Sequence, residues 1–165
     1  MLFYGDEAGY TNDYSYLDDP GKSYDNRWMH RPVIDWRKNA RTEEPGTTEH
    51  VLFSGTQKLI AIRKKLTLVG DWNNLYWLAP HPALAERTVP VAGYVRVREG
   101  QRLYCLFNFS PEKANLTWYA FKEHGPAPGL LYDHWTGQSY RAGADNEYLV
   151  IEPFSFLLLE STNPA

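Results

Sequence analysis

Acidic side chains are concentrated in the segment from Gly5 to Pro32, which reads GDEAGYTNDYSYLDDPGKSYDNRWMHRP. Its carboxylates belong to Asp6, Glu7, Asp13, Asp18, Asp19 and Asp25. Paired carboxylates can cleave a glycosidic bond, but the two acids must face each other across that bond, roughly 5 to 10 Å apart. Adjacent Asp6 and Glu7 point in different directions, so the segment by itself predicts no catalytic pair.

Two other kinds of chemistry are disfavoured by the residue pattern. An acidic loop could bind Ca²⁺, yet the fixed glycine and terminal glutamate of a calcium-binding loop are missing, so we predict no metal site. No serine lies in a G-x-S-x-G elbow, and the 5 histidines have no visible partner. The residues alone therefore predict no nucleophilic Ser–His–Asp set either.

One cysteine and a weak net charge limit the classes of protein to which the chain can belong. Cys105 lies in an apolar stretch without a disulfide partner, which predicts a buried, unreactive thiol in a reducing, cytoplasmic setting. The net charge of −3, without a basic stripe, argues against nucleic acid as a partner. No apolar run approaches the roughly 20 residues that cross a bilayer, and the start lacks a secretory signal, so we expect no membrane partner.

The elements that would position the acidic segment begin with a short apolar strand, Met1–Tyr4. Residues 11–46 show no sustained period and are predicted to form a long loop, which is uncommon unless it is functional or belongs to something larger. A helix follows, with Thr47 or Thr48 as its cap. Its apolar stripe contains Leu52, Gly55, Leu59, Ile62 and Leu66, and its end carries Arg63, Lys64 and Lys65. Such a stripe must dock on a partner.

From about Asn73 the pattern changes to short β-rich runs separated by turn residues. The expected strands are Val91–Val97, Leu103–Phe109, Asn115–Phe121, Gly129–Asp133, Tyr148–Ile151 and Phe154–Glu160. Antiparallel strands at this spacing predict a small β-sandwich.

Aromatic residues make up 15% of the chain, with 6 Trp and 12 Tyr. Flat rings stack on the apolar faces of sugars, so these residues would suit a carbohydrate-binding surface. Packing inside the β-domain explains them as well, and we favour that interpretation.

The string GDE-x-G, followed by a loop ending in DNRWMHRP, resembles the eighth strand and following loop of glycoside hydrolase family thirteen, the α-amylase superfamily. The resemblance is to amylosucrases and similar sucrose hydrolases. The strings IAIRKK, YVRVREGQRLYCLFNFS and EPFSFLLLE continue it in the same order, over essentially the whole chain. It implies a mostly β fold, in which residues 1–72 end a (β/α)8 barrel and residues 73–165 form the C-terminal antiparallel β-sandwich.

The resemblance also implies that catalytic residues are missing from this chain. The family's aspartate nucleophile, glutamate acid/base and transition-state-stabilising aspartate lie on barrel strands four, five and seven, all upstream of Met1. Catalytic groups of such barrels lie at the C-terminal ends of the strands. We therefore expect a C-terminal fragment that has no turnover by itself.

Arg27 is the residue that matches a family position in the substrate pocket. Its counterpart pairs with an upstream aspartate and closes the floor of the glucose pocket, as a planar guanidinium can do with a carboxylate. Without the resemblance, pairing with a nearby loop acid such as Asp25 or Asp19 is favoured; with it, we favour the pocket role. Asp6 and Glu7 resemble acids of the pocket rim.

The parent enzyme implied by the resemblance would transfer glucose from sucrose to water or to an α-glucan by retaining double displacement, without an organic cofactor. Two alternatives stay open for the chain itself. It could be a carbohydrate-binding β-domain, or a structural module that covers a barrel supplied elsewhere. In the second case we expect the isolated chain to self-associate through the stripe around Leu59 and Ile62.

Overall fold

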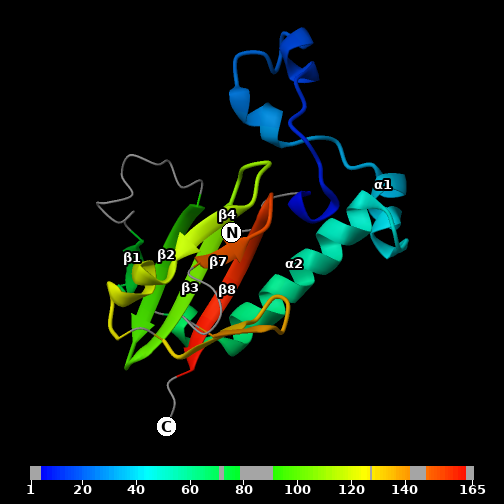
Figure 1. Ribbon diagram of the computed structural model, residues 1–165. Coiled ribbons are helices and arrows are strands. Elements are labelled where there is room, and N and C mark those ends of the chain that lie inside the picture. Colours follow the sequence, from blue (N-terminus) through cyan, green and yellow to red (C-terminus); the bar gives the residue numbers. More distant parts are fainter. Residues whose placement is uncertain (1–4, 71–72, 79–90, 127, 142–147, 163–165) are drawn as a thin grey trace. The chain divides into compact units, whose positions relative to one another are not determined.

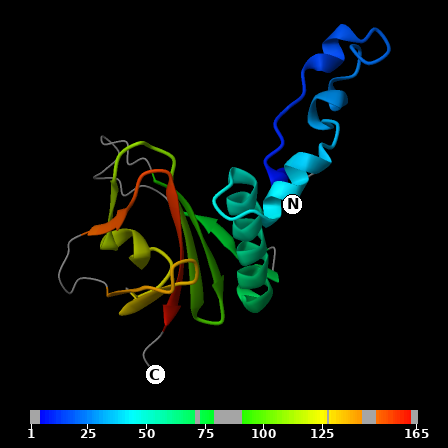
Figure 2. The ribbon, with the colours of Figure 1, turned by 90° about the vertical axis from the view of Figure 1, so that its right-hand side faces the viewer.

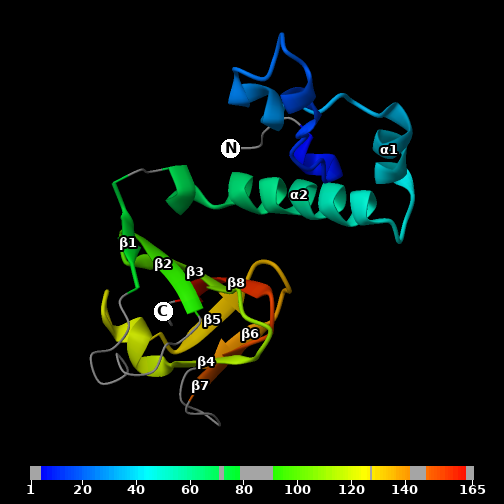
Figure 3. The ribbon, with the colours of Figure 1, turned by 90° about the horizontal axis from the view of Figure 1, so that it is seen from above.

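The computed structural model describes residues 5–70, 73–78, 91–126, 128–141 and 148–162. The chain divides into two units, Met1–Ala61 and Ile62–Ala165, which are described separately (Figures 1 and 3). The predicted strand Met1–Tyr4 lies outside the described residues. The predicted division after residue 72 adjoins residues 71–72, which are also outside them, and it stays a prediction.

The first unit is built from short helical turns. The 3-10 helices are Asp6–Ala8, Ser15–Asp18, Asn26–His30 and Arg41–Glu43, and α1 spans Trp36–Ala40. The expectation of a loop without regular structure over residues 11–46 was therefore incomplete. Its aspartates bond the backbone N–H two residues ahead, as from Arg27 to Asp25 and from Arg37 to Asp35. Such local bonds stabilise short turns without any long apolar period.

Helix α2 (Thr48–Lys65) is the long helix that the sequence predicts. Thr47 is its N-cap, since the backbone N–H of His50 donates to Thr47 Oγ1 over 3.1 Å. Arg63, Lys64 and Lys65 occupy its last turn, where positive charge is favourable beside the carbonyl end of the helix dipole. Among the described residues, no helix is long and apolar enough to cross a membrane.

The second unit is an antiparallel β-sandwich, which confirms the predicted mostly β fold (Figures 1 and 2). The larger sheet has the order β1 (Leu75–Trp77), β2 (Val91–Arg98), β3 (Gln101–Asn108), β8 (Ser155–Thr162), β5 (Leu130–Asp133), β6 (Ser139–Arg141). A smaller sheet pairs β4 (Ala114–Thr117) with β7 (Tyr148–Ile151). Each of these pairings is antiparallel.

One predicted strand was wrong over half of its length. Residues Asn115–Phe121 were expected to be one strand, but β4 ends at Thr117 and a 3-10 helix, Trp118–Lys122, follows. This helix is attached to the sheet by its backbone, because Tyr104 Oη donates to the Phe121 carbonyl over 3.2 Å. The aromatic run therefore contributes Phe121 to the core through a helical turn instead of a strand.

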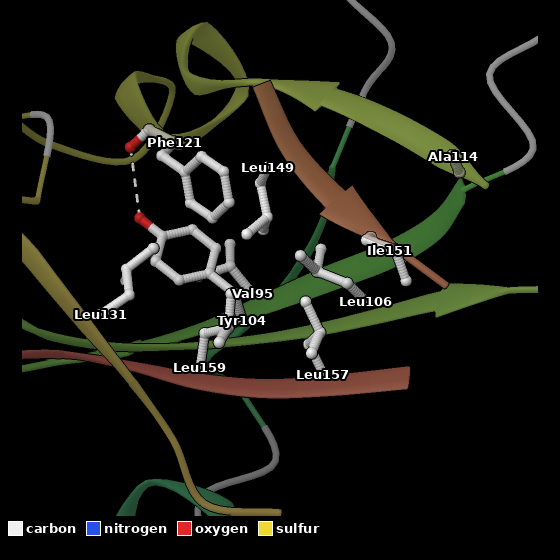
Figure 4. Packing of buried hydrophobic residues seen from close by; sticks show 10 residues of the cluster. All are labelled: Val95, Tyr104, Leu106, Ala114, Phe121, Leu131, Leu149, Ile151, Leu157 and Leu159. Carbon is white, nitrogen blue, oxygen red and sulfur yellow. Dashed lines mark hydrogen bonds between the residues drawn. The ribbon is translucent and has the colours of Figure 1, made fainter. Parts of the chain in front are cut away.

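The main core lies between the two sheets (Figure 4). It contains Val95, Tyr104, Leu106, Ala114, Phe121, Leu131, Leu149, Ile151, Leu157 and Leu159. The rings of Tyr104 and Phe121 pack edge to face with centroids 4.7 Å apart, a favoured aromatic geometry. Alternate residues of β3 and β8 supply this core, as the two-residue period of a strand requires.

A second apolar cluster lies on the opposite face of the large sheet. The buried side chains of Leu66 and Leu68 pack there with Leu103 and Cys105, and Ile62 is half-buried against them. Cys105 is thus a buried free thiol, as predicted. Burial raises the pKa of the Cys105 thiol, which disfavours the reactive thiolate.

Candidate functional site

The acidic residues of the GDEAG string form one tight turn. The 3-10 helix Asp6–Ala8 lies between Gly5 and Gly9, both of which adopt left-handed conformations with φ of 80° and 65°. A Cβ added at Gly9 would lie 2.6 Å from Leu52 Cδ1 of α2, so the turn approaches the helix closely. Ala8 is buried, whereas Asp6 is exposed and Glu7 is half-buried. The turn therefore presents its carboxylates at the surface of the unit.

Tyr10 links this turn to α1. The backbone N–H of Tyr10 donates to the Gly5 carbonyl, and its ring lies against Gly5, where an added Cβ would be 2.9 Å from Tyr10 Cδ2. Its hydroxyl accepts from the Asp35 N–H over 2.8 Å and lies 2.9 Å from both the Asp35 carbonyl and Asn39 Oδ1. One phenol thus connects the acidic turn with both ends of a short helix.

Glu49 forms an ion cluster at the start of α2. The residue is only 5% exposed, and its Oε1 accepts from Lys38 Nζ over 3.1 Å while Arg41 Nε lies 3.4 Å from Oε2. The Glu49 backbone N–H and the hydrogen bond from Lys38 hold the pKa of this carboxyl below its usual range. The Lys38 ammonium also lies 5.4 Å from the Tyr10 ring centroid, within cation–π range.

Arg27 pairs locally with Asp25. Its Nε donates to Asp25 Oδ1 over 2.8 Å and its Nη2 to Oδ2 over 2.7 Å, a two-pronged pair, and the Arg27 side chain is 73% exposed. The Arg27 side chain and then its backbone N–H lower the pKa of Asp25 to about 2. Of the two loop acids considered from the sequence, Asp25 is the partner in this chain, while Asp19 pairs with Lys22. The pocket-floor role of Arg27 stays a prediction.

The segment between the acidic turn and α2 has no buried side chain. Every residue from Gly9 to Thr48 is exposed or half-buried. Large apolar side chains are exposed there, namely Tyr14, Leu17, Tyr24, Trp28, Val33 and Trp36. Because it buries so little apolar surface, the segment relies on local hydrogen bonds for its shape. We call residues 9–48 the arm.

The structure brings together only some of the residues predicted for the site. Asp6 and Glu7 share one turn, whereas Arg27 is paired with Asp25. Within the described part of the chain, no group of three or more His, Cys, Asp or Glu side chains could hold a metal ion. Tyr10, Lys38 and Glu49 were not predicted, because their contacts join residues 11 to 29 positions apart and follow no local period.

No known protein-family model matches the sequence. The structure is similar to that of an AmyP variant in complex with maltotriose, with a TM-score of 0.55 and 13% identity over 75% of this chain and 23% of that chain. AmyP in complex with maltose gives a TM-score of 0.53 and 13% identity over 71% and 22%.

An Anoxybacillus α-amylase, described as a new glycosyl hydrolase subclass, has a TM-score of 0.53 and 16% identity over 89% of this chain and 26% of its own. The chain thus spans about a quarter of the length of each of these proteins. At such identities the likeness shows the fold alone: this chain is folded like part of each of these proteins, and its mostly β structure contains an antiparallel β-sandwich.

Proposed function

We propose that the chain is the C-terminal part of an amylosucrase-type α-glucan enzyme, and that it is inactive by itself. The observation that carries the proposal is the structural likeness to an α-amylase over 89% of this chain and only 26% of the other. The strings GDE-x-G, DNRWMHRP and LFNFS, in that order, support the amylosucrase type. AmyP, whose structures hold maltotriose and maltose, supports an α-glucan as the ligand class.

In the parent enzyme an upstream aspartate would attack the anomeric carbon of sucrose, while an upstream glutamic acid protonates the departing fructose oxygen. Water or the 4-hydroxyl of an α-glucan would then displace the aspartate, after the glutamate has removed its proton, so configuration is retained. Arg27 would leave Asp25 for the family's upstream aspartate and close the pocket floor. The exposed, two-pronged geometry of the present pair is compatible with such an exchange of partners.

The arm also supports an origin in a larger protein. Long segments that bury no side chain and expose several aromatic residues are uncommon in isolated domains, unless another surface covers them. A barrel supplied upstream would provide that surface. Asp6 and Glu7, in the turn that precedes the arm, would then lie on the pocket rim.

The test is a chimera in which this chain replaces the corresponding C-terminal part of an active amylosucrase. We expect the chimera to release fructose from sucrose, the isolated chain to release none, and Arg27→Ala in the chimera to reduce release at least 100-fold. Val33→Ala, which changes another exposed arm residue, is the matched control. A folded, monomeric chimera without activity, or release by the isolated chain that Arg27→Ala abolishes, would overturn the proposal.

A carbohydrate-binding β-domain is the second candidate, and an aromatic row whose two end residues, Trp77 and Phe109, are exposed favours it. Trp77 is 73% exposed and packs edge-on against Tyr94, with ring centroids 6.2 Å apart. The Tyr94 ring in turn contacts the ring of Phe107, with centroids 6.2 Å apart. Phe109 stacks in parallel on Phe107, with centroids 6.0 Å apart. Saturable maltoheptaose binding that Trp77→Ala abolishes and Trp36→Ala preserves would support this candidate, whereas binding that both variants retain would count against it.

A further inference from the structure

We infer that Tyr10, Lys38 and Glu49 form a positioning network that holds the acidic turn Gly5–Gly9 in one orientation. The ordering of the turn by this network is independent of the proposed function. Only the further step, that the turn serves a sugar pocket, rests on the proposed function. The three residues come from three separate segments of the first unit: the start of the arm, α1 and α2. No local signal in the sequence connects them.

The first link is between the turn and Tyr10. Two of the turn's N–H groups, on Ala8 and Gly9, bond carbonyls inside the turn, and the Tyr10 N–H closes the turn on the Gly5 carbonyl over 3.1 Å. The turn alone is one short 3-10 helix of three residues, which has little stability in water. Its orientation therefore depends on its contacts with the rest of the unit, which are the close approach of Gly9 to Leu52 and the attachment of Tyr10.

The second link is between Tyr10 and α1. A hydroxyl has one proton to donate and two lone pairs. The Tyr10 hydroxyl accepts from the Asp35 N–H at 2.8 Å and has two acceptors within 2.9 Å for its own proton, the Asp35 carbonyl and Asn39 Oδ1. The phenol is thereby fixed against both the N-terminal and the C-terminal end of α1.

The third link joins α1 to α2 through the Glu49 carboxylate. Glu49 is nearly buried, and burying a charge is costly unless it is paired. Lys38 supplies the hydrogen bond, and the same ammonium faces the Tyr10 ring, so one cation contacts both other members of the network. Arg41 is close to Glu49 Oε2, although no hydrogen bond forms to that oxygen. Loss of the Lys38 cation would weaken two links at once.

A simpler role for Glu49 would be to stabilise the first turn of α2 through the helix dipole. The two roles differ in what they protect. A helix-stabilising residue slows hydrogen exchange at the amides of α2. The positioning network instead slows exchange at the amides of Ala8, Gly9 and Tyr10, which lie some forty residues earlier in the sequence.

The test is amide hydrogen exchange, measured by NMR on the purified full chain. We expect Tyr10→Phe and Lys38→Met each to speed exchange at Ala8, Gly9 and Tyr10 or its replacement by about tenfold. Lys38→Arg, which keeps the cation, should restore exchange to near the wild-type rate. The control is Lys113→Met, which removes the exposed ion pair of Lys113 with Glu152 in the other unit. It should leave the exchange rates of these three amides unchanged.

Unchanged exchange at the three turn amides would overturn the inference, as would equal acceleration in the turn and in the middle of α2. A separate readout addresses the pocket. In the active chimera, Tyr10→Phe should raise the KM for sucrose about tenfold and change kcat less, and an unchanged KM would show that the network does not serve the rim. An inactive chimera would contradict the proposed function alone, since the exchange measurement needs no sugar.

Discussion

Asn108, within the LFNFS string, has the densest set of side-chain hydrogen bonds in the described part of the sandwich. Its Nδ2 has two N–H groups, which are shared among the carbonyls of Glu112, Ile151 and Glu152 at 2.7 to 3.2 Å, and its Oδ1 accepts from both the N–H and the hydroxyl of Ser110. This one amide therefore joins the loop after β3 to the loop after β7. The string that carried part of the family resemblance thus has a structural explanation.

We predict that Asn108→Ala lowers the free energy of unfolding by about 3 kcal/mol, because it leaves buried polar groups without partners. Asn108 is 1% exposed, so water cannot replace the amide without a rearrangement. Urea unfolding followed by tryptophan fluorescence measures the change. Asn115→Ala, at an exposed position of β4, is the control and should cost under about 0.5 kcal/mol. Equal losses in the two variants would contradict this explanation of Asn108.

Arg27 shows what residue types alone could predict about the site. Its partner Asp25 lies two positions away, so local pairing was foreseeable from the sequence. The network of Tyr10, Lys38 and Glu49 was not, because a tyrosine, a lysine and a glutamate far apart in sequence carry no sign that they will meet. The role of Arg27 in a sugar pocket depends on residues outside this chain and stays a prediction.

At the scale of elements, the long helix and the four-residue strands β5 and β7 were predicted well, whereas the shortest elements were not. Helix α2 was foreseeable because it combines a cap, a periodic stripe and basic residues at its end. Strands β1 and β6 have three residues each, too few for a two-residue period to stand out, and were missed. The helical turns of the arm depend on single aspartate caps, which a search for periodicity cannot detect.

The cap of α2 gives a prediction at this scale. Thr47→Ala should lower the free energy of unfolding of the helix-containing unit by about 1 kcal/mol, because the His50 N–H loses its acceptor. Thermal unfolding followed by far-UV circular dichroism measures the loss. Thr47→Ser keeps the hydroxyl and should remain within about 0.3 kcal/mol of the wild type. If alanine and serine behave alike, Thr47 is not the energetic cap.

For the whole molecule, the exposed apolar side chains of α2 bear on the predicted self-association. Ile62 is half-buried in the cluster around Leu66 and Leu103, so it is less available than the stripe suggested. Val51, Leu52, Leu59 and Ile60 remain exposed, with Leu59 at 41%. Of these, Leu52 and Leu59 lie about two turns apart on one face of α2, and an exposed row of this kind is a common site of association between copies.

We predict that the isolated chain self-associates through this row and that Leu59→Glu weakens the association at least tenfold. Sedimentation velocity over a hundredfold range of protein concentration measures it. Gln57→Glu introduces the same charge at another exposed position of α2 and is the control. A wild-type chain that stays monomeric at every concentration would exclude this association.

The large sheet is bounded on both sides by its shortest strands, β1 and β6, while the eight-residue strands β2, β3 and β8 lie inside it. Unpaired backbone groups at a sheet edge are where foreign strands add and fibrils grow. Of the long strands, β3 is paired at length along both edges, whereas β1 covers β2 at only three positions and β5 covers β8 at only four. Each outer strand of the large sheet offers only three residues of backbone, which limits the addition of foreign strands at these two edges.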